Sequence, residues 1–309
     1  MTFIEFKDNL IAALKKSLSN TVLADAELTH QSVEKLNGSY NALCVRPANS
    51  IIGMNLNLDS LYSAYNSCPD ADFAMLVEKT TEECIKGIQE SPSVNINDLT
   101  DYSKVKDKLS LEVVSAERNA EALKSIPHNN IEDMAVITRI IIDKNDFGNA
   151  TVVITDSLCQ KFGITKEQLF ADALESAPII RPSEIKGMTE VLSEMLSSDL
   201  MPDILPEDEQ IFVATVPDKS HGAGVIAYPN FMEDAAKKLG GSFFILPSSI
   251  HEILLVRDNG KMTVSELENM VKEVNSTQVE LADQLTDSVY YYDSEKHLFE
   301  LAEKALKSA

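Results

Sequence analysis

One short segment gathers more reactive side chains than any other part of the sequence. It lies between the apolar runs 243–246 and 253–256 and contains Pro247, Ser248, Ser249, His251 and Glu252. A serine hydroxyl, an imidazole base and a carboxylate are the groups that a serine hydrolase combines. The residue types therefore raise the hypothesis of a hydrolase-type enzyme, with Ser248 or Ser249 as nucleophile and His251 as base, together with Glu252.

The spacing of these groups argues against that chemistry. A nucleophilic serine usually sits on a sharp turn flanked by glycines, and Pro247 and Ile250 stand where those glycines would be. In a strand-like segment, His251 rarely reaches a serine two or three residues away. We therefore expect the hydroxyls to satisfy backbone groups where the chain crosses from one core strand to the next. The pair His251-Glu252 also starts a zinc-protease pattern, but Leu255 replaces its second histidine, so we predict no metal site.

Four residues outside this segment are candidate binding residues. His128 and His221 lie in predicted loops, and Tyr290 and Tyr292 alternate along a predicted strand, so both rings would share one face. Packing over a sheet edge is the ordinary role for such tyrosines, and docking of a partner is the alternative. The glycine-containing segment 218–224 joins two predicted strands rather than a strand and a helix, so it lacks the setting of a phosphate-binding loop. We predict no cofactor.

Composition excludes several classes of protein. The 309 residues carry a formal charge of −22, which repels nucleic acid and anionic membrane surfaces. No apolar run approaches the roughly 20 residues that a membrane-spanning helix needs. The four cysteines are widely spaced and fit neither a disulfide framework nor a zinc site. The N-terminus is acidic too early for a signal peptide, and we therefore expect a cytoplasmic protein.

Residues 1–92 are predicted to form an N-terminal helix–β-hairpin–strand–helix module. A helix over 3–18 precedes strands over 26–36 and 40–45, which turn at Asn37-Gly38. A strand over 51–58 follows, then helices over 60–65, capped by Asp59, and from Asp70 or Asp72 to Gln89. The polar run 90–93 contains a proline, and we place a domain boundary there.

Residues 93–309 are predicted to form a larger α+β region. Strands and helices alternate, and most neighbouring strands are joined by short turns, so the sheets should be mixed and mainly antiparallel with flanking helices. The predicted strands include a hairpin of 211–216 with 224–228, and the predicted helices include 165–176, 183–197, 230–239 and 265–275. A strand, a loop and a capping box occur twice, ending in Thr165 with Gln168 and in Thr263 with Glu266. This similarity allows an internal strand–turn–helix repeat.

Through Ile245-Leu246-Pro247-Ser248-Ser249-Ile250-His251-Glu252 the chain resembles an uncharacterised bacterial family, a domain of unknown function that is frequent in anaerobic gut bacteria. Looser similarity covers nearly the whole chain, for example at 99–107, 126–128, 222–224, 270–275 and 285–293. After His128 the family often has a basic residue, whereas this chain has Asn129. The resemblance implies a shared fold and no particular chemistry.

Together these observations favour a non-catalytic binding or interaction protein of unknown ligand or partner, a protein partner included. The alternative is the hydrolase that uses Ser248 or Ser249, His251 and Glu252. The surroundings of His251 distinguish the two hypotheses. A hydrolase would place its ring in a pocket with a free face, and a binding protein would hold it in satisfied hydrogen bonds.

Overall fold

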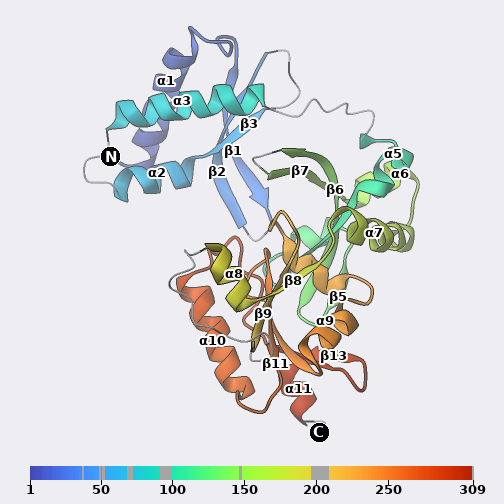
Figure 1. The fold of residues 1–309 in the computed structure, drawn as a ribbon. Helices are drawn as coiled ribbons and strands as arrows, with labels where there is room; N and C mark the ends of the chain where they lie inside the picture. Colours follow the sequence, from blue (N-terminus) through green and yellow to red (C-terminus); the bar gives the residue numbers. More distant parts are fainter. Residues whose placement is uncertain are drawn as a thin grey trace. The chain divides into compact units, whose positions relative to one another are not determined.

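The structure is a computed structural model, and Figure 1 shows its fold. It describes residues 1–36, 38–48, 50, 53–67, 72–90, 99–145, 148–195 and 209–307. The chain divides into two compact units, residues 1–93 and 94–309, which are described separately.

The first unit packs helices against a small antiparallel sheet. Its elements are α1 (Phe3–Leu18), β1 (Glu27–Lys35), β2 (Gly38–Arg46), β3 (Met54–Asn57), α2 (Leu58–Ser67) and α3 (Phe73–Gln89). The strands pair in the order β1-β2-β3. Helix α1 begins with a capping box between Thr2 and Glu5, and its apolar side chains recur at helical spacing. These side chains form the unit's core together with residues of β2 and β3.

One expectation for this unit changes. Asp59 does not cap α2, because the helix already begins at Leu58 and the Asn57 side chain accepts the Ser60 amide at 3.0 Å. Asp59 instead accepts the backbone and side-chain amides of Asn41 at 2.8 and 3.0 Å, and so ties α2 to β2. The predicted turn residue Asn37, the start of the predicted strand 51–58 and residues 91–93 lie outside the described residues.

The second unit contains two sheets and their flanking helices. Its elements are α5 (Tyr102–Val105), η1 (Lys106–Lys108), β4 (Leu109–Ser115), η2 (Ala122–Ser125), β5 (Asn129–Ile131), β6 (Met134–Asn145), β7 (Gly148–Val153), α6 (Asp156–Phe162), α7 (Lys166–Ile180), β8 (Glu184–Gly187), α8 (Met188–Met195), β9 (Ile211–Thr215), η4 (Gly222–Ala227), α9 (Phe231–Leu239), β10 (Phe243–Leu246), β11 (Ile253–Arg257), α10 (Val264–Thr277), β12 (Tyr290–Asp293), β13 (Leu298–Leu301) and α11 (Ala302–Lys307).

Both sheets of this unit are antiparallel. The larger has the order β13-β12-β10-β11-β9-β8, and in the smaller β6 pairs with β4, β5 and β7. Strand β10 shows how the larger sheet is covered on both faces. Phe243 and Ile245 enter the main core, which also contains residues of β4, α7 and η4, whereas Phe244 and Leu246 pack with α10 residues such as Leu267. The predicted α+β class with mainly antiparallel sheets and flanking helices is confirmed.

The predicted strand 224–228 is wrong, because residues 222–227 form the 3₁₀ helix η4. Strand β9 pairs instead with β11 and β8. Two glycines explain the difference, because η4 lies directly against other backbone. A Cβ atom on Gly224 would collide with the Leu111 carbonyl oxygen of β4, and one on Gly222 would collide with Thr215 and the His251 carbonyl oxygen.

The predicted helix 183–197 divides into strand β8 and helix α8. In the predicted repeat, Thr263 and Glu266 form a complete capping box, whereas Thr165 only accepts the Gln168 amide. The predicted loop before Thr165 contains helix α6, which the second copy lacks among its described residues. An internal repeat therefore stays a prediction.

No helix in the described part of the chain has the length and apolar character that crossing a membrane requires. The described cysteines, Cys44, Cys84 and Cys159, are free thiols. Burial raises the pKa of the Cys84 thiol to about 11, which keeps it protonated and unreactive near neutral pH.

Candidate functional site

Residues 247–252 form the crossing between β10 and β11. The crossing is fixed by backbone bonds to a later segment, in which the Leu285 amide donates to the Ser248 carbonyl at 3.0 Å and the Ile250 amide donates to the Asp283 carbonyl at 2.9 Å. Ser248 and Ser249 are both buried. The Ser249 hydroxyl accepts the His251 backbone amide at 3.0 Å. This is the backbone role that the sequence predicted for a hydroxyl at this crossing.

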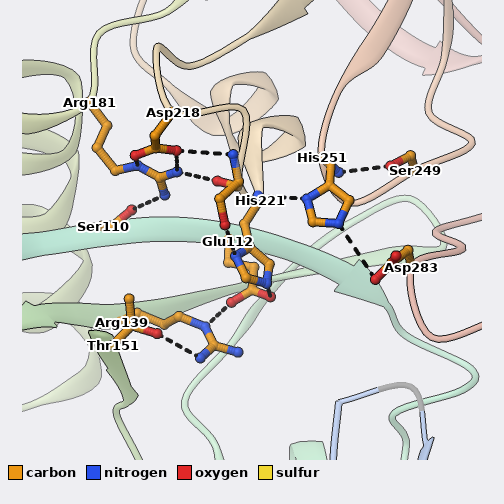
Figure 2. A network of polar contacts seen from close by, with 11 residues as sticks. Ser110, Glu112, Arg139, Thr151, Arg181, Asp218, His221, Ser249, His251 and Asp283 are labelled. Carbon is orange, nitrogen blue, oxygen red and sulfur yellow. Dashed lines mark hydrogen bonds and ion pairs between the residues drawn. The ribbon is translucent and has the colours of Figure 1, made fainter. Parts of the chain in front are cut away.

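The His251 ring is held by two contacts that lead away from the serines (Figure 2). Its Nδ1 accepts the His221 backbone amide at 3.2 Å, and its Nε2 lies 3.5 Å from Asp283 Oδ1. Among the described residues, the ring has no hydrogen bond to either serine. Since Nδ1 is an acceptor, a neutral His251 carries its proton on Nε2, toward the carboxylate.

His221 lies beside His251, with 5.6 Å between the ring centroids. Its backbone is left-handed, with φ of 51°. Its Nε2 lies 3.4 Å from Glu112 Oε1, and its Nδ1 lies 3.1 Å from the Ser220 hydroxyl. In both histidines Nε2 lies near a carboxylate and Nδ1 lies near a neutral group, which is a backbone amide for His251 and a hydroxyl for His221.

Burial lowers the pKa of the His221 imidazole below its usual value. Glu112 opposes this effect, while the positive charges of Arg139 and Arg181 and the neighbouring His251 add to the lowering. His221 therefore binds a proton less readily than an ordinary histidine does.

Glu112 is a buried carboxylate in the middle of strand β4, where it is the strand's one charged residue. Arg139 of β6 donates to it through Nε and also donates to Thr151 Oγ1 at 3.1 Å. The sheet register pairs Ser110 with Arg139 and Glu112 with Ile137, so the two charged residues are diagonal neighbours on one face. The guanidinium offsets the cost of burying the carboxylate.

A second buried arginine fixes the turn that carries His221. Arg181 donates to both Asp218 carboxylate oxygens, at 2.6 and 3.2 Å, and to Ser110 Oγ at 3.3 Å. It also donates to the Ser220 carbonyl. The turn is joined to the crossing by backbone as well, because the Ala223 amide donates to the Ile250 carbonyl at 3.1 Å. Thr215 Oγ1 donates to the His251 carbonyl at 2.8 Å.

The two histidines of the network differ in what their Nδ1 atoms face. The Nδ1 of His251 accepts a backbone amide, so its lone pair is occupied, whereas a general base needs a lone pair aimed at the proton it removes. The Nδ1 of His221 faces the Ser220 hydroxyl, and each Nε2 lies near a carboxylate. Both rings keep some access to solvent, because 34% of the His251 side chain and 29% of the His221 side chain are exposed. The carboxylate of Glu252 bonds to neither ring among the described residues.

Three other candidate residues lie apart from this network. His128 Nδ1 contacts the Ile126 carbonyl at 2.8 Å, so His128 is held locally. The carboxylate of Asp133, which is nearby in sequence, accepts hydrogen bonds from Thr286 and Ser288 at 2.8 and 2.9 Å, and one from Tyr290. The described residues contain no group of three or more His, Cys, Asp or Glu side chains that could hold a metal ion.

Tyr290 and Tyr292 share one face of β12, as the alternation predicts, but that face is covered. Their exposed fractions are 0% and 3%, because both rings belong to the main core of the second unit. Strand β12 also lies between β13 and β10 rather than at the sheet edge. The two rings therefore do not provide an exposed docking surface. The Tyr292 hydroxyl instead reaches a hollow, where it lies 3.2 Å from His297 Nδ1.

This hollow has a volume of about 520 Å³ and lies between the first turns of α9 and the end of β12. Its polar lining comes mainly from Asn230, Glu233, Asp234, Lys237, Tyr292 and His297. The volume falls in the range of about 300 to 1,000 Å³ that is usual for small-molecule sites. Asp234 is already paired with Lys237 at 2.8 Å, and Glu233 lies 3.8 Å from His297.

Sequence reasoning identified His221 and His251 but missed the charged residues that position them. Glu112 and Arg139 are single charges inside apolar runs, and such a charge requires a partner when the strand is buried on both faces. The sequence therefore indicates that Glu112 and Arg139 each need a polar partner in the fold. No comparable signal identified Arg181 and Asp218, because their contact depends on the fold of the 217–222 turn.

Comparison with known proteins gives a family and no activity. No curated protein matches the chain, and no solved structure matches it. The family DUF5688, described as a family of unknown function, matches residues 3–294, which covers most of both units and every residue of the network around His221 and His251. The chain belongs to this family of unknown function.

Proposed function

We propose that this protein is a non-catalytic binding protein and that residues 247–252 are a structural crossing rather than an active site. One observation carries the proposal: His251 Nδ1 accepts the His221 amide, while Ser249 Oγ accepts the His251 amide. The base and a hydroxyl of the hydrolase hypothesis are therefore both engaged with backbone, and neither activates the other.

The hollow beside Tyr292 is the proposed binding site. The charges of Lys237 and Asp234 in the lining neutralise each other. When His297 is neutral, the lining therefore has a net negative charge, which Glu233 carries. A small polar ligand with a basic amino group suits this balance, since Glu233 can accept from it and the Tyr292 hydroxyl can orient it. The charge of −22 also disfavours anionic ligands.

The proposed setting is the bacterial cytoplasm. The acidic composition and the free, buried thiols of Cys84 and Cys159 support it. The crossing at 247–252 is proposed as a structural feature that members of the family share. Its support is the number of backbone and side-chain bonds that converge there from the 217–224 turn and from 283–285.

A fluorophosphonate probe tests the absence of serine hydrolase chemistry. We expect no labelling of the intact protein under conditions in which a reference serine hydrolase is fully labelled. Labelling that disappears in Ser248→Ala or Ser249→Ala would establish the hydrolase and overturn the proposal. Intact-protein mass spectrometry measures both outcomes.

Nuclear magnetic resonance titration tests the binding site, with putrescine and arginine as cationic probes and citrate as an anionic probe. We expect the cations, and not citrate, to shift the amide resonances of Gly241, Ser294 and His297. Glu233→Gln should abolish the shifts, whereas Glu273→Gln on the exposed surface of α10 should preserve them. Shifts elsewhere, or equal shifts in both variants, would contradict the proposed site.

A further inference from the structure

The outer edge of β1 offers an interaction surface in the first unit, separate from the proposed binding site. Strand β1 has nine residues and pairs along its full length with β2. The sheet order β1-β2-β3 leaves its other edge without a partner strand among the described residues. Along such an edge, every second residue points its backbone amide and carbonyl away from the sheet.

The usual devices that protect an edge strand are absent from the middle of β1. Protected edges are short or carry lysine, proline or a bulge. Residues 28–33 contain no proline and no Asp, Glu, Lys or Arg, and the pairing with β2 runs through nine residues without a register shift. The side chains of Thr29, His30, Gln31 and Ser32 are exposed. The opposite edge, β3, has only four residues.

The sequence of β1 is complementary to itself when two copies run antiparallel about Gln31. In that register Glu27 lies opposite Lys35 of the second copy, and Thr29 lies opposite Val33. Glu27 also pairs with Arg46 of its own sheet. In the joined sheet a row of alternating charge would therefore cross three strands, from Arg46 of β2 through Glu27 of β1 to the lysine at position 35 of the second copy.

We propose that two copies of this chain associate by joining their β1 edges in this antiparallel register. The pairing is a two-fold symmetric contact, so each favourable charge pair occurs twice. It extends each three-stranded sheet into one of six strands and satisfies the outward backbone groups of both edges. Two edge strands bury less than a standard interface, so the dimer is weak and depends on protein concentration.

Sedimentation velocity on the full-length protein tests the association. The test is that Lys35→Glu should weaken the dimer in wild type and strengthen it in the Glu27→Lys background. Wild type should convert from monomer to dimer as its concentration rises toward the millimolar range. Lys35→Glu should weaken the dimer about fivefold, since it replaces an attractive pair with a repulsive one on each side. Glu27→Lys should weaken it more, because positions 46, 27 and 35 would then all be positive. In the Glu27→Lys background, Lys35→Glu should instead strengthen the dimer.

Cysteine cross-linking tests the register. Opposite residues of antiparallel strands have Cα atoms about 4.5 to 5.5 Å apart, which suits a disulfide. Gln31→Cys should therefore form a disulfide-linked dimer under mild oxidation. Ser32→Cys is the matched control, because its two copies would be offset by two residues and lie more than about 7 Å apart. Wild type measures the background from the native cysteines.

Three results would overturn the proposal. The first is a monomer at every concentration, which would leave the edge for a strand from a different protein. The second is a dimer in which Lys35→Glu has the same effect in both backgrounds. The third is equal cross-linking of Gln31→Cys and Ser32→Cys. Circular dichroism of each variant establishes that the change lies in association and not in folding.

Discussion

At the scale of single residues, the hydrogen-bond partner decides what each histidine can do. The Nδ1 lone pair of His251 is directed at a backbone amide, and its Nε2 proton is directed at Asp283. The Nδ1 of His221 instead faces the Ser220 hydroxyl, which can donate or accept, and its Nε2 lies 3.4 Å from Glu112 Oε1. Burial disfavours the charged form of the His221 ring, and the positive charges of Arg139 and Arg181 act in the same direction.

This arrangement predicts that acid weakens the fold through His221. Because burial lowers its folded-state pKa below the unfolded value, the unfolded state binds more protons as the pH falls. The stabilisation is complete above the unfolded pKa, near 6.5, and is lost as the pH falls through the lower folded-state pKa. Urea unfolding from pH 7.5 to 5 measures this loss.

His221→Asn is the control for this prediction, since asparagine tolerates the left-handed backbone at this position and does not titrate. The free energy of unfolding should depend less on pH in the variant than in wild type. An equal dependence in both proteins would show that His221 does not contribute. The His221 ring resonances in wild type should also titrate with a midpoint below that of an unfolded histidine.

The sequence identified the histidines of the site because imidazole is rare and chemically conspicuous. It identified neither the tautomers nor the partners, because those depend on which residues the sheet register brings together. Glu112 and Arg139 are separated by 26 residues in sequence and become neighbours only through the pairing of β4 with β6. Composition and local spacing contain no information about that pairing.

At the scale of elements, single residues mark the ends of some helices correctly, although Asp59 does not cap α2. Asp72 caps α3 as one of the two expected residues, and Gly240 ends α9 in the left-handed conformation. The segment after β9 was assigned wrongly because its conformation is set by other strands. Residues 222–227 form η4 because Gly222 and Gly224 allow close contact with the backbone of other segments. Those segments are brought beside the glycines only by the fold, so the local sequence does not reveal the contact.

The contact between η4 and β4 predicts a large effect for a small substitution. Gly224→Ala places a methyl group against the Leu111 carbonyl oxygen, and neither backbone can move without disturbing the core. We expect a loss of about 3 kcal/mol in the free energy of unfolding, as for severe overpacking. Urea denaturation followed by circular dichroism measures it.

Gly187→Ala is the matched substitution in the same unit. Its new methyl group meets only the side chain of Glu209, which is flexible and can turn aside. The loss of stability should therefore be clearly smaller than for Gly224→Ala. If the two variants were equally stable, η4 would not rest on β4 as closely as the structure indicates.

At the scale of the whole molecule, the two compact units have separate cores. The core of the first unit draws on α1, α2, α3 and its own sheet, and the cores of the second unit contain only residues after 94. We therefore predict that residues 1–93 and residues 94–309 each fold when expressed alone. Each fragment should unfold cooperatively in urea and should give dispersed amide resonances that overlay those of the full chain.

A fragment with collapsed amide dispersion would contradict independent folding. The test has a built-in comparison, because the aromatic cluster of Phe6, Tyr65 and Phe73 lies wholly within the first unit. Its ring resonances should be unchanged between the fragment and the full chain.

The position of β12 also has a consequence for synthesis on the ribosome. The strand lies inside the larger sheet, against β10, although it is formed by residues 290–293 near the end of the chain. Until those residues leave the exit tunnel, the apolar strand β10 has only β11 beside it, and its other edge is open. The larger unit therefore completes its sheet only after β12 and β13 have been translated. Nascent chains stalled before Tyr290 should be the ones that need chaperones.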